Sequence, residues 1–307
     1  MRNGEVERGS GPWPSTNTEQ AIRNWLVKRI EFEDAHEVRS SVDWMLDEVS
    51  GHSKAERIGM AWAAHESQLE TLALWADRMK RGEPLHYILG KAYFRDLVIA
   101  VDPRVLIPRP ETEELVYAME ERLRSHRHPR RVLDLGTGSG IIPLDWKSRY
   151  PADEVYGLDV SADALEVART NAERLHIAVE WIEEDVLRIG ATPPWQGVFD
   201  VIFSNPPYIP WAERGNLETQ VKDWEPAQAL FVADEDPLVF YRHIIRGCEQ
   251  LGWLAEDGWL GLECHRDGVA AVAGLFDSQA WTCVERLMDM QGNDRMILAR
   301  RSSVIRA

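Results

Sequence analysis

Apolar residues recur at helical spacing through the first ninety residues of the chain. The positions that carry this pattern form three sets: Ile22, Trp25, Leu26 and Ile30; Val38, Val42, Met45, Leu46 and Val49; and Leu69, Leu72, Ala73, Ala76 and Met79. Ser53 followed by Glu56 has the form of a capping box and predicts one further helix. Four amphipathic helices indicate a small bundle over residues 18–90, and the polar residues 1–17 before it are expected to form a flexible tail.

The pattern changes after this bundle. Residues 91–110 alternate between apolar and polar positions and contain several prolines, which favours short strands or a hairpin that joins two domains. A helix is expected next, with Glu111, Glu113 and Glu114 in its opening turn. Acidic side chains there suit the positive end of the helix dipole, and a functional role for them is equally open.

Beyond residue 130, short apolar runs alternate with helical stretches. The runs are typical of buried strands, over residues 131–136, 154–160, 179–186 and 197–204. The clearest helix between them covers Ala162–Leu175. Alternating strands and helices indicate a parallel sheet with right-handed crossovers, so we predict an α/β domain over residues 111–307.

The composition fits a globular protein of about two domains. Of the 307 residues, 44% are apolar and 28% are charged. The three cysteines form no CxxC pair and the nine histidines form no HExxH spacing, so we predict reduced thiols and no metal site. The start of the chain is polar, and no run reaches the ~18 apolar residues of a membrane helix. We therefore expect a soluble, cytoplasmic protein that does not enter a membrane.

The negative charge is concentrated in the second domain. The formal net charge is −16, and residues 131–307 carry 16 Lys and Arg against 29 Asp and Glu, a net −13. An acidic surface repels phosphate backbones, which argues against a nucleic-acid partner. The charge either serves solubility alone or favours a basic protein partner.

A glycine-rich turn, LDLGTGSG, covers residues 133–140 and follows the first strand of this domain. A strand, a glycine turn and a helix in this order let the backbone approach a nucleotide-type cofactor. The GxGxG spacing differs from the GxGxxG of dinucleotide binders, because position 141 is isoleucine. It resembles motif I of the Rossmann-like S-adenosylmethionine methyltransferases, although a purely structural turn is an alternative. The candidate cofactor-binding residues are Gly136, Thr137, Gly138, Ser139 and Gly140.

Acidic residues end the next two predicted strands. Asp159 lies 23 residues beyond Gly136, where a carboxylate can accept both hydroxyls of a ribose. Its alternative role is that of a helix cap, which Ser161 could fill equally well. Asp185 and Val186 end the following strand, where folds of this kind hold the adenine. One acid per strand end, in chain order, predicts a nucleoside site.

The motif Asn205-Pro-Pro-Tyr208 directly follows the last predicted strand and is the most specific signal in the chain. Pro206 and Pro207 fix the backbone and lack N–H donors, so their carbonyls remain as acceptors. Asn205 adds a side-chain oxygen acceptor, and Tyr208 adds a flat face. Such a loop suits a planar NH2 group, because holding both hydrogens turns the delocalised lone pair of the nitrogen toward an incoming methyl group.

Taken together, these motifs resemble the HemK-like N5-glutamine methyltransferases of peptide chain release factors. Five stretches carry the resemblance: GEPLHYILG, LIPRPETEEL, LDLGTGSG, SNPPYIP and DMQGNDRMILA. The resemblance covers nearly the whole chain. It implies a Rossmann-like class I methyltransferase domain preceded by a small N-terminal helical bundle, with S-adenosyl-L-methionine as cofactor. The implied substrate is the glutamine of the GGQ motif of class I release factors, held between the two domains.

The resemblance also implies roles for the candidate residues. Asn205, Pro206 and Tyr208 would be catalytic, and these three with Pro207 would hold the glutamine amide. The implied cofactor-binding residues are residues 136–140, Asp159, Asp185, Val186 and Asn205.

Three residues depart from the pattern of this family. The helix after the glycine turn reads IIPLDWKSRY, in which Pro143 is tolerable only in the first turn and Asp145 occupies an expected apolar position. Val186 stands where related sequences often carry an aromatic residue over the adenine. We therefore expect local differences in the packing of this helix and in the affinity for the cofactor.

Three other functions remain open at this point. Relatives that share NPPY methylate a glutamine of a ribosomal protein, although residues 221–238 and 292–295 are closer to the release-factor branch. DNA adenine-N6 methyltransferases also share NPPY, but a net −13 domain offers little basic surface for phosphates. A cofactor-binding regulator without activity is the non-enzymatic alternative, and the intact NPPY motif argues against it.

Overall fold

The chain divides into two compact units in a computed structural model that describes residues 9–30, 35–124, 129–190 and 192–303. The first unit comprises Met1–Leu89 together with Thr219–Trp224, and the second comprises Gly90–Glu218 and Glu225–Ala307. A short segment from the second half of the sequence therefore belongs to the first unit, which no sequence pattern indicates.

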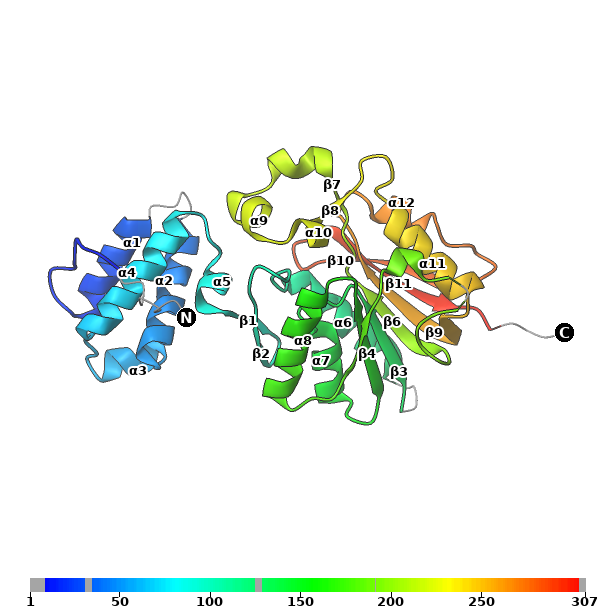
Figure 1. The fold of residues 1–307 in the computed structure, drawn as a ribbon, viewed down its shortest axis with the longest axis horizontal. Helices are drawn as coiled ribbons and strands as arrows, with labels where there is room; N and C mark the ends of the chain where they lie inside the picture. Colours follow the sequence, from blue (N-terminus) through cyan, green and yellow to red (C-terminus); the bar gives the residue numbers. More distant parts are fainter. Residues whose placement is uncertain (1–8, 31–34, 125–128, 191, 304–307) are drawn as a thin grey trace, which may run out of the picture. The chain divides into compact units, whose positions relative to one another are not determined.

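The first unit is helical. Its helices are α1 (Glu19–Ile30), α2 (Ala35–Ser50), α3 (Lys54–Gly59), α4 (Glu66–Lys80), α5 (Leu85–Leu89) and α9 (Thr219–Trp224) (Figure 1). The four predicted helices are confirmed, and their apolar faces form one core in which Leu26, Leu46 and Leu72 are fully buried. The capping box at α3 is confirmed as well, because the Ser53 side chain accepts from the Glu56 amide and the Ser53 amide donates to the Glu56 carboxylate.

The polar start of the chain, which the sequence predicts as a flexible tail, is described from residue 9 onward, and residues 1–8 lie outside the described residues. The described part lies against the helices. The Trp25 indole donates to the Pro12 carbonyl at 2.7 Å, and Arg29 donates to the Ser10 carbonyl at 2.7 Å. Residues 9–17 are therefore anchored on α1.

A seven-stranded sheet in the order β10-β11-β9-β6-β3-β4-β5 forms the centre of the second unit. Its strands are β3 (Arg131–Leu135), β4 (Glu154–Asp159), β5 (Glu180–Glu183), β6 (Phe199–Ser204), β9 (Leu254–Glu263), β10 (Trp281–Met288) and β11 (Asp294–Arg301). The first five are parallel, and β11 runs antiparallel to both β9 and β10. The four strands predicted from the sequence are confirmed as β3, β4, β5 and β6.

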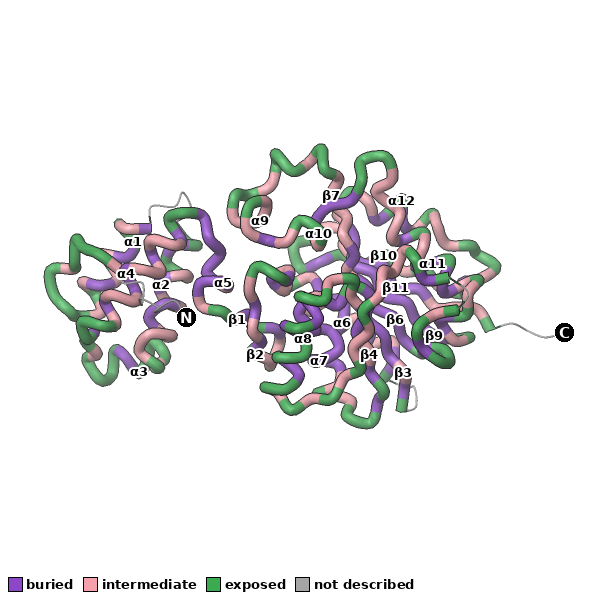
Figure 2. The backbone as a smooth tube through the Cα atoms, viewed as in Figure 1, coloured by how far each residue is buried: buried purple, intermediate pink, exposed green. Residues whose placement is uncertain are grey.

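Helices cover both faces of this sheet (Figure 1). One face carries α6 (Pro110–Leu123), α7 (Ile141–Arg149) and α8 (Ala162–Leu175), and the other carries α11 (Val239–Gln250) and α12 (Val269–Ala273). The strands between the two layers are largely buried (Figure 2). This arrangement confirms the Rossmann-like α/β fold.

Smaller elements complete the second unit. A hairpin of β1 (Lys91–Phe94) and β2 (Leu97–Ala100) precedes α6, as the alternating pattern there predicts. The chain between β5 and α11 also forms short elements: η1 (Val186–Arg188), β7 (Ile209–Pro210), η2 (Trp211–Asn216), α10 (Ala227–Leu230) and β8 (Phe231–Val232).

Both unusual residues of α7 fit the structure. The helix begins at Ile141, so Pro143 lies in its first turn, where a backbone N–H has no partner within the helix. The Asp145 side chain is fully buried and forms ion pairs with Arg95 at 2.8 Å and Arg149 at 3.3 Å. Burial raises the pKa of Asp145, and the two guanidinium groups oppose that rise. A paired carboxylate therefore takes the place of the expected apolar residue.

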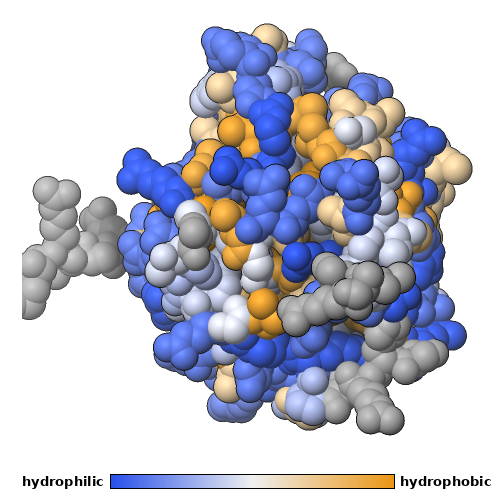
Figure 3. Space-filling view, turned by 90° about the vertical axis from the view of Figure 1, so that its right-hand side faces the viewer, coloured by the Kyte–Doolittle hydropathy of each residue, from blue (hydrophilic) through white to orange (hydrophobic). Residues whose placement is uncertain are grey.

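The surface is predominantly hydrophilic on the face shown in Figure 3, with a band of apolar side chains among the polar ones. No helix within the described ranges is both long enough and apolar enough to cross a lipid bilayer.

Candidate active site

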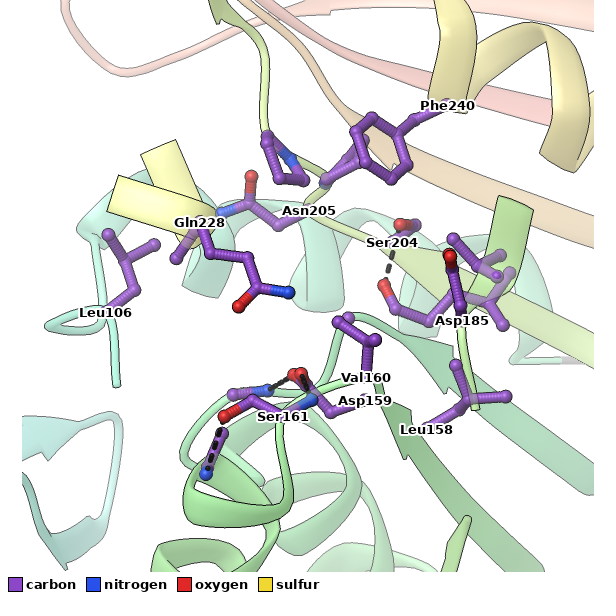
Figure 4. Close-up of a pocket in the computed structure, with 18 of the residues that line it drawn as sticks. Leu106, Leu158, Asp159, Val160, Ser161, Asp185, Ser204, Asn205, Gln228 and Phe240 are labelled. Atoms are coloured by element: carbon purple, nitrogen blue, oxygen red, sulfur yellow. Dashed lines mark hydrogen bonds between the residues drawn. The ribbon is translucent and has the colours of Figure 1, made fainter. Parts of the chain in front are cut away.

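The carboxyl ends of the parallel strands border a cavity of about 280 Å³ in the second unit. The strand order reverses beside β3, which lies between β6 and β4, and a crevice forms at such a point because the connecting segments leave in opposite directions. Residues that follow β3, β4, β5 and β6 line the cavity, together with residues 104–106, residues 226–229 and Phe240 (Figure 4).

The glycine turn after β3 forms one wall. Gly136, Gly138 and Gly140 all have positive φ values, of 78°, 53° and 79°, which glycine adopts without strain. A Cβ at Gly136 or Gly138 would meet no described atom within 4 Å, so these two residues leave room beside the cavity. A Cβ at Gly140 would lie 2.7 Å from Trp181, so that glycine is required for packing.

Asp159 is the last residue of β4 and lies beside the glycine turn. Its carboxylate accepts from the Gly138 amide at 2.8 Å and from the Ser161 amide at 2.9 Å. Burial raises the pKa of Asp159, and these backbone hydrogen bonds oppose the rise. Ser161 is the N-cap of α8, because its hydroxyl accepts from the Ala164 amide at 3.2 Å. Asp159 is therefore not needed as the helix cap, and it lines the cavity.

Asp185 and Val186 follow β5 and also line the cavity. The Asp185 carboxylate accepts from the Leu187 amide at 3.0 Å and caps η1. Val186 and Leu187 add apolar surface, and Phe240 of α11 supplies an aromatic ring to the same cavity.

The Asn205–Tyr208 loop leaves the carboxyl end of β6 and forms the wall opposite Asp159 and Ser161 (Figure 4). The Ser204 hydroxyl donates to the Leu135 carbonyl at 2.7 Å and ties the start of this loop to β3. The Asn205 amide nitrogen donates to the Thr112 hydroxyl at 3.3 Å. Asn205, Pro206 and Pro207 face the cavity, whereas the Tyr208 hydroxyl reaches the Glu263 carboxylate at 3.4 Å.

A buried carboxylate joins the two loops that complete the wall. Glu225 accepts from the Ile107 amide at 3.2 Å and from the Arg109 guanidinium at 2.5 Å. The cavity is lined here by the loop at residues 104–106, which precedes Ile107, and by Pro226, Gln228 and Ala229, which follow Glu225. Glu225 therefore holds together segments that are far apart in the sequence.

Comparison with known proteins identifies the family. The Methyltransferase small domain family matches residues 111–220. The release factor glutamine methyltransferase of Geobacter sulfurreducens is 34% identical over 293 residues, which are 94% of this chain and 98% of that protein. This chain belongs to the release factor glutamine methyltransferase family. The family member of Bacteroides thetaiotaomicron is 37% identical over 240 residues, which are 78% of this chain and 82% of that protein.

A solved structure is similar in fold. The catalytic domain of hMettl16, in complex with the MAT2A 3'UTR hairpin 1, has a TM-score of 0.52 and 17% sequence identity, and the match covers 77% of this chain and 82% of that one. At this identity the likeness concerns the methyltransferase fold alone.

Methyltransferases of this family and fold use S-adenosyl-L-methionine, and the cavity fits that cofactor. The Asp159 carboxylate offers acceptors for a ribose, the open sides of Gly136 and Gly138 give access to backbone, and Val186 and Leu187 offer apolar contact for a planar base. Within the described ranges, no three His, Cys, Asp or Glu side chains are grouped so as to hold a metal ion.

The structure brings most of the residues predicted for this methyltransferase site to one cavity. Those that line it are Gly136, Gly138, Asp159, Asp185, Val186, Asn205, Pro206 and Pro207. Four predicted residues lie behind the wall instead. The side chains of Thr137 and Ser139 are buried, Gly140 packs against Trp181, and Tyr208 points to Glu263. In this structure they shape the site rather than line the cavity.

Sequence reasoning missed Thr112, Glu225 and Glu263. Glu263 ends the buried strand β9, so the rule that found Asp159 and Asp185 could have found it had that strand been recognised. Thr112 lies between Glu111 and Glu113 in the opening turn of α6, where the sequence pattern distinguishes the acidic residues and not the threonine.

The two possible roles of Asp159 predict different effects of Asp159→Ala. If Asp159 accepts the ribose hydroxyls, the substitution should weaken S-adenosylmethionine binding by roughly 1.5–3 kcal/mol, the usual scale for hydrogen bonds to a charged group. Isothermal titration calorimetry measures this, with Ser161→Ala as the control that removes only the helix cap. Equal losses in the two folded variants would assign Asp159 a structural role alone.

Asp134 predicts a pH effect on stability. It is buried in β3, and one of its oxygens has no hydrogen-bond partner among the described residues. Burial raises its pKa from 3.8 to about 7, and the charge of Asp159 adds to the rise. Between these values the folded chain keeps a proton that the unfolded chain has released, so the free energy of unfolding falls as pH rises.

We therefore expect Asp134→Asn, which cannot ionise, to become increasingly more stable than the natural chain between pH 4.5 and pH 8. Urea unfolding at several pH values measures the difference. The control is Asp236→Asn, because the exposed Arg242 lowers the pKa of Asp236 and its contribution is already complete at pH 5. A constant difference between Asp134→Asn and the natural chain would show that Asp134 is ionised throughout.

Proposed function

We propose that this chain transfers a methyl group from S-adenosylmethionine to the side-chain nitrogen of a glutamine in a peptide chain release factor. The observation that carries the proposal is the position of the Asn205–Tyr208 loop, whose first three residues line the same cavity as Asp159. The loop that we propose binds the amide and the carboxylate that we propose binds the ribose thus face one cavity. The names of the relatives that cover most of this chain support the substrate class.

The chemistry needs positioning more than it needs a base. Bound S-adenosylmethionine supplies an electrophilic methyl group on sulfur. The glutamine nitrogen is a poor nucleophile because its lone pair is delocalised into the amide. The oxygen of Asn205 and the carbonyl of Pro206 are proposed to accept the two N–H hydrogens, which directs the lone pair toward the methyl group. The methylated nitrogen is briefly cationic and strongly acidic, so its proton leaves to water.

The proposed partner is a class I release factor, with the glutamine of its GGQ motif as the acceptor. The net −13 charge of residues 131–307 favours a protein over DNA or RNA as the direct partner. Release factors act at the ribosome, so the reaction is proposed to take place in the cytoplasm.

The decisive experiment offers the chain labelled S-adenosylmethionine and three acceptors: a class I release factor, a ribosomal protein and DNA. Label in the release factor, located by mass spectrometry on the GGQ glutamine, would support the proposal. Label only in the ribosomal protein or in DNA would replace it with one of the two alternatives, and no transfer to any acceptor would point to a binding protein.

The helical unit is proposed to dock the protein substrate. Every described residue that lines the cavity belongs to the second unit, so the helices of the first contribute none of the cofactor wall. A second surface is needed to recognise a folded protein, because one glutamine side chain offers little area for specific binding.

A chain shortened to residues 90–307 keeps all the lining residues. If it folds, as judged by circular dichroism, we expect unchanged S-adenosylmethionine affinity and loss of turnover on intact release factor. Turnover equal to that of the full chain would contradict the docking role.

Asn205→Ala directly tests the proposal that Asn205 accepts a hydrogen bond from the glutamine amide. It removes one acceptor and leaves β6 and both prolines in place. We expect kcat to fall by roughly 10²–10³, the scale for one preorganised transition-state hydrogen bond, with a much smaller change in cofactor affinity. Single-turnover methyl transfer measures the first quantity and calorimetry the second. A folded variant with the natural kcat would exclude this mechanism.

A further inference from the structure

A chain of hydrogen bonds, here called the row, supports the Asn205 side chain from the protein interior. The Asn205 amide nitrogen donates to the Thr112 hydroxyl at 3.3 Å, and the Thr112 hydroxyl donates to the Glu263 carboxylate at 2.5 Å. The other oxygen of Glu263 accepts from the Tyr208 hydroxyl at 3.4 Å. The row thus connects both ends of the Asn205–Tyr208 loop to the first turn of α6 and to the last residue of β9.

We propose that Thr112 and Glu263 are positioning residues that hold the Asn205 amide with its oxygen directed to the substrate. The proposal rests on the proposed glutamine methylation and names the residues that set the direction of its acceptor.

The direction follows from counting hydrogens. A carboxylate only accepts, and a hydroxyl has a single hydrogen to donate. Since Thr112 gives that hydrogen to Glu263, it can only accept from Asn205, and the NH2 group of Asn205 must therefore face Thr112. The Asn205 oxygen is left as the free acceptor, which is the atom that a substrate NH2 group needs. With the amide turned over, Asn205 would present two donors to the substrate and would repel it.

Glu263 holds Asn205 in this orientation only when it is ionised, and its surroundings permit ionisation. The Glu263 side chain is buried. Burial and the charge of Glu111 raise its pKa to about 6, while the hydrogen bonds from Thr112 and Tyr208 and the charge of Arg295 oppose the rise. The carboxylate is therefore the main form at neutral pH. Thr112 is buried as well, so water does not readily compete for its hydroxyl.

Burying a carboxylate without a hydrogen-bonded cation costs free energy, and an apolar residue would fill the end of β9 more cheaply. Within the described residues, the Glu263 side chain accepts hydrogen bonds from two hydroxyls, those of Thr112 and Tyr208. Both belong to the surroundings of the NPPY loop. A role in orienting that loop accounts for a carboxylate at this position, whereas a role in stability alone does not.

Two variants change the row in different ways. Thr112→Val keeps the shape of the side chain and removes the hydroxyl, whereas the matched control Thr112→Ser keeps the hydroxyl. Glu263→Gln replaces the carboxylate by an amide whose NH2 group can donate to the Thr112 hydroxyl. The Thr112 hydrogen is then free to bond the Asn205 oxygen, which favours the reversed orientation of the Asn205 side chain. We expect kcat on the release factor to fall by about 10–100-fold in Thr112→Val and in Glu263→Gln, on the scale of one lost orienting hydrogen bond, with the Kd of S-adenosylhomocysteine unchanged.

A double-mutant cycle with Asn205→Ala distinguishes positioning from a general loss of structure. If Thr112 acts through Asn205, then Thr112→Val should reduce kcat only slightly in a chain that already carries Asn205→Ala. Thr112→Ser alone should keep most of the kcat of the natural chain, because it retains the hydroxyl. Equal losses with and without Asn205, natural kcat in Thr112→Val, or a loss in Thr112→Ser as large as in Thr112→Val would overturn the proposal.

The natural chain serves as the reference for the function itself. Failure of the natural chain to methylate the release factor would reject the proposed function, whereas the ratios within the cycle test only the positioning role. Where Glu263→Gln does not fold, the two Thr112 variants decide the matter alone.

Discussion

The site depends on one constraint, the reversal of strand order beside β3. Because β6, β3, β4 and β5 are parallel, their carboxyl ends meet at one edge of the sheet. Short polar segments that are far apart in the sequence are thereby brought to a single cavity, among them the turn at Gly136, the carboxylate of Asp159 and the loop at Asn205. A change in the register of any of these strands would displace its segment from the others.

Buried carboxylates join the parts that the sheet does not hold. Asp145 binds Arg95 of the β1–β2 hairpin, Glu225 binds Arg109 and the backbone of Ile107, and Glu263 binds Thr112. A buried ion pair often adds little net stability compared with apolar packing, because both charges lose their hydration. The contribution of these carboxylates is better understood as specificity, because a packing that separated one of them from its donors would leave a buried charge without compensation.

Local patterns predicted the elements, and contacts distant in sequence escaped prediction. Apolar residues spaced three to four positions apart around Leu26, Leu46 and Leu72 predicted three of the helices, because one face of a helix recurs at that spacing. Asp159 was predicted as a site residue because a clear apolar strand precedes it. Glu263 follows the same rule, but the segment LAEDGWLGLE contains two charged residues in its first half, which hide the strand.

The partners of the buried charges could not be predicted from such local patterns. Asp145 appeared as a misfit in an apolar helix because its partner Arg95 lies 50 positions earlier. Glu225 lies 118 positions after Ile107 and 116 positions after Arg109. No periodicity connects positions so far apart, so these contacts emerge only when the chain is folded.

The last residue of α9, Trp224, belongs to the helical unit, and the next residue, Glu225, belongs to the second unit, where it binds Ile107 and Arg109. The two units are thus joined there by a single peptide bond, with no linker to absorb a displacement. A displacement of α9 that preserved the bonds of Glu225 to Ile107 and Arg109 would require rotation about the backbone dihedrals that flank this peptide bond. If binding of a protein to the helical unit changes the affinity for the cofactor, that coupling is reciprocal, because linkage fixes a single coupling free energy for both sites. Whatever factor docking of a protein adds to the affinity for the cofactor, the cofactor would return to the affinity for that protein.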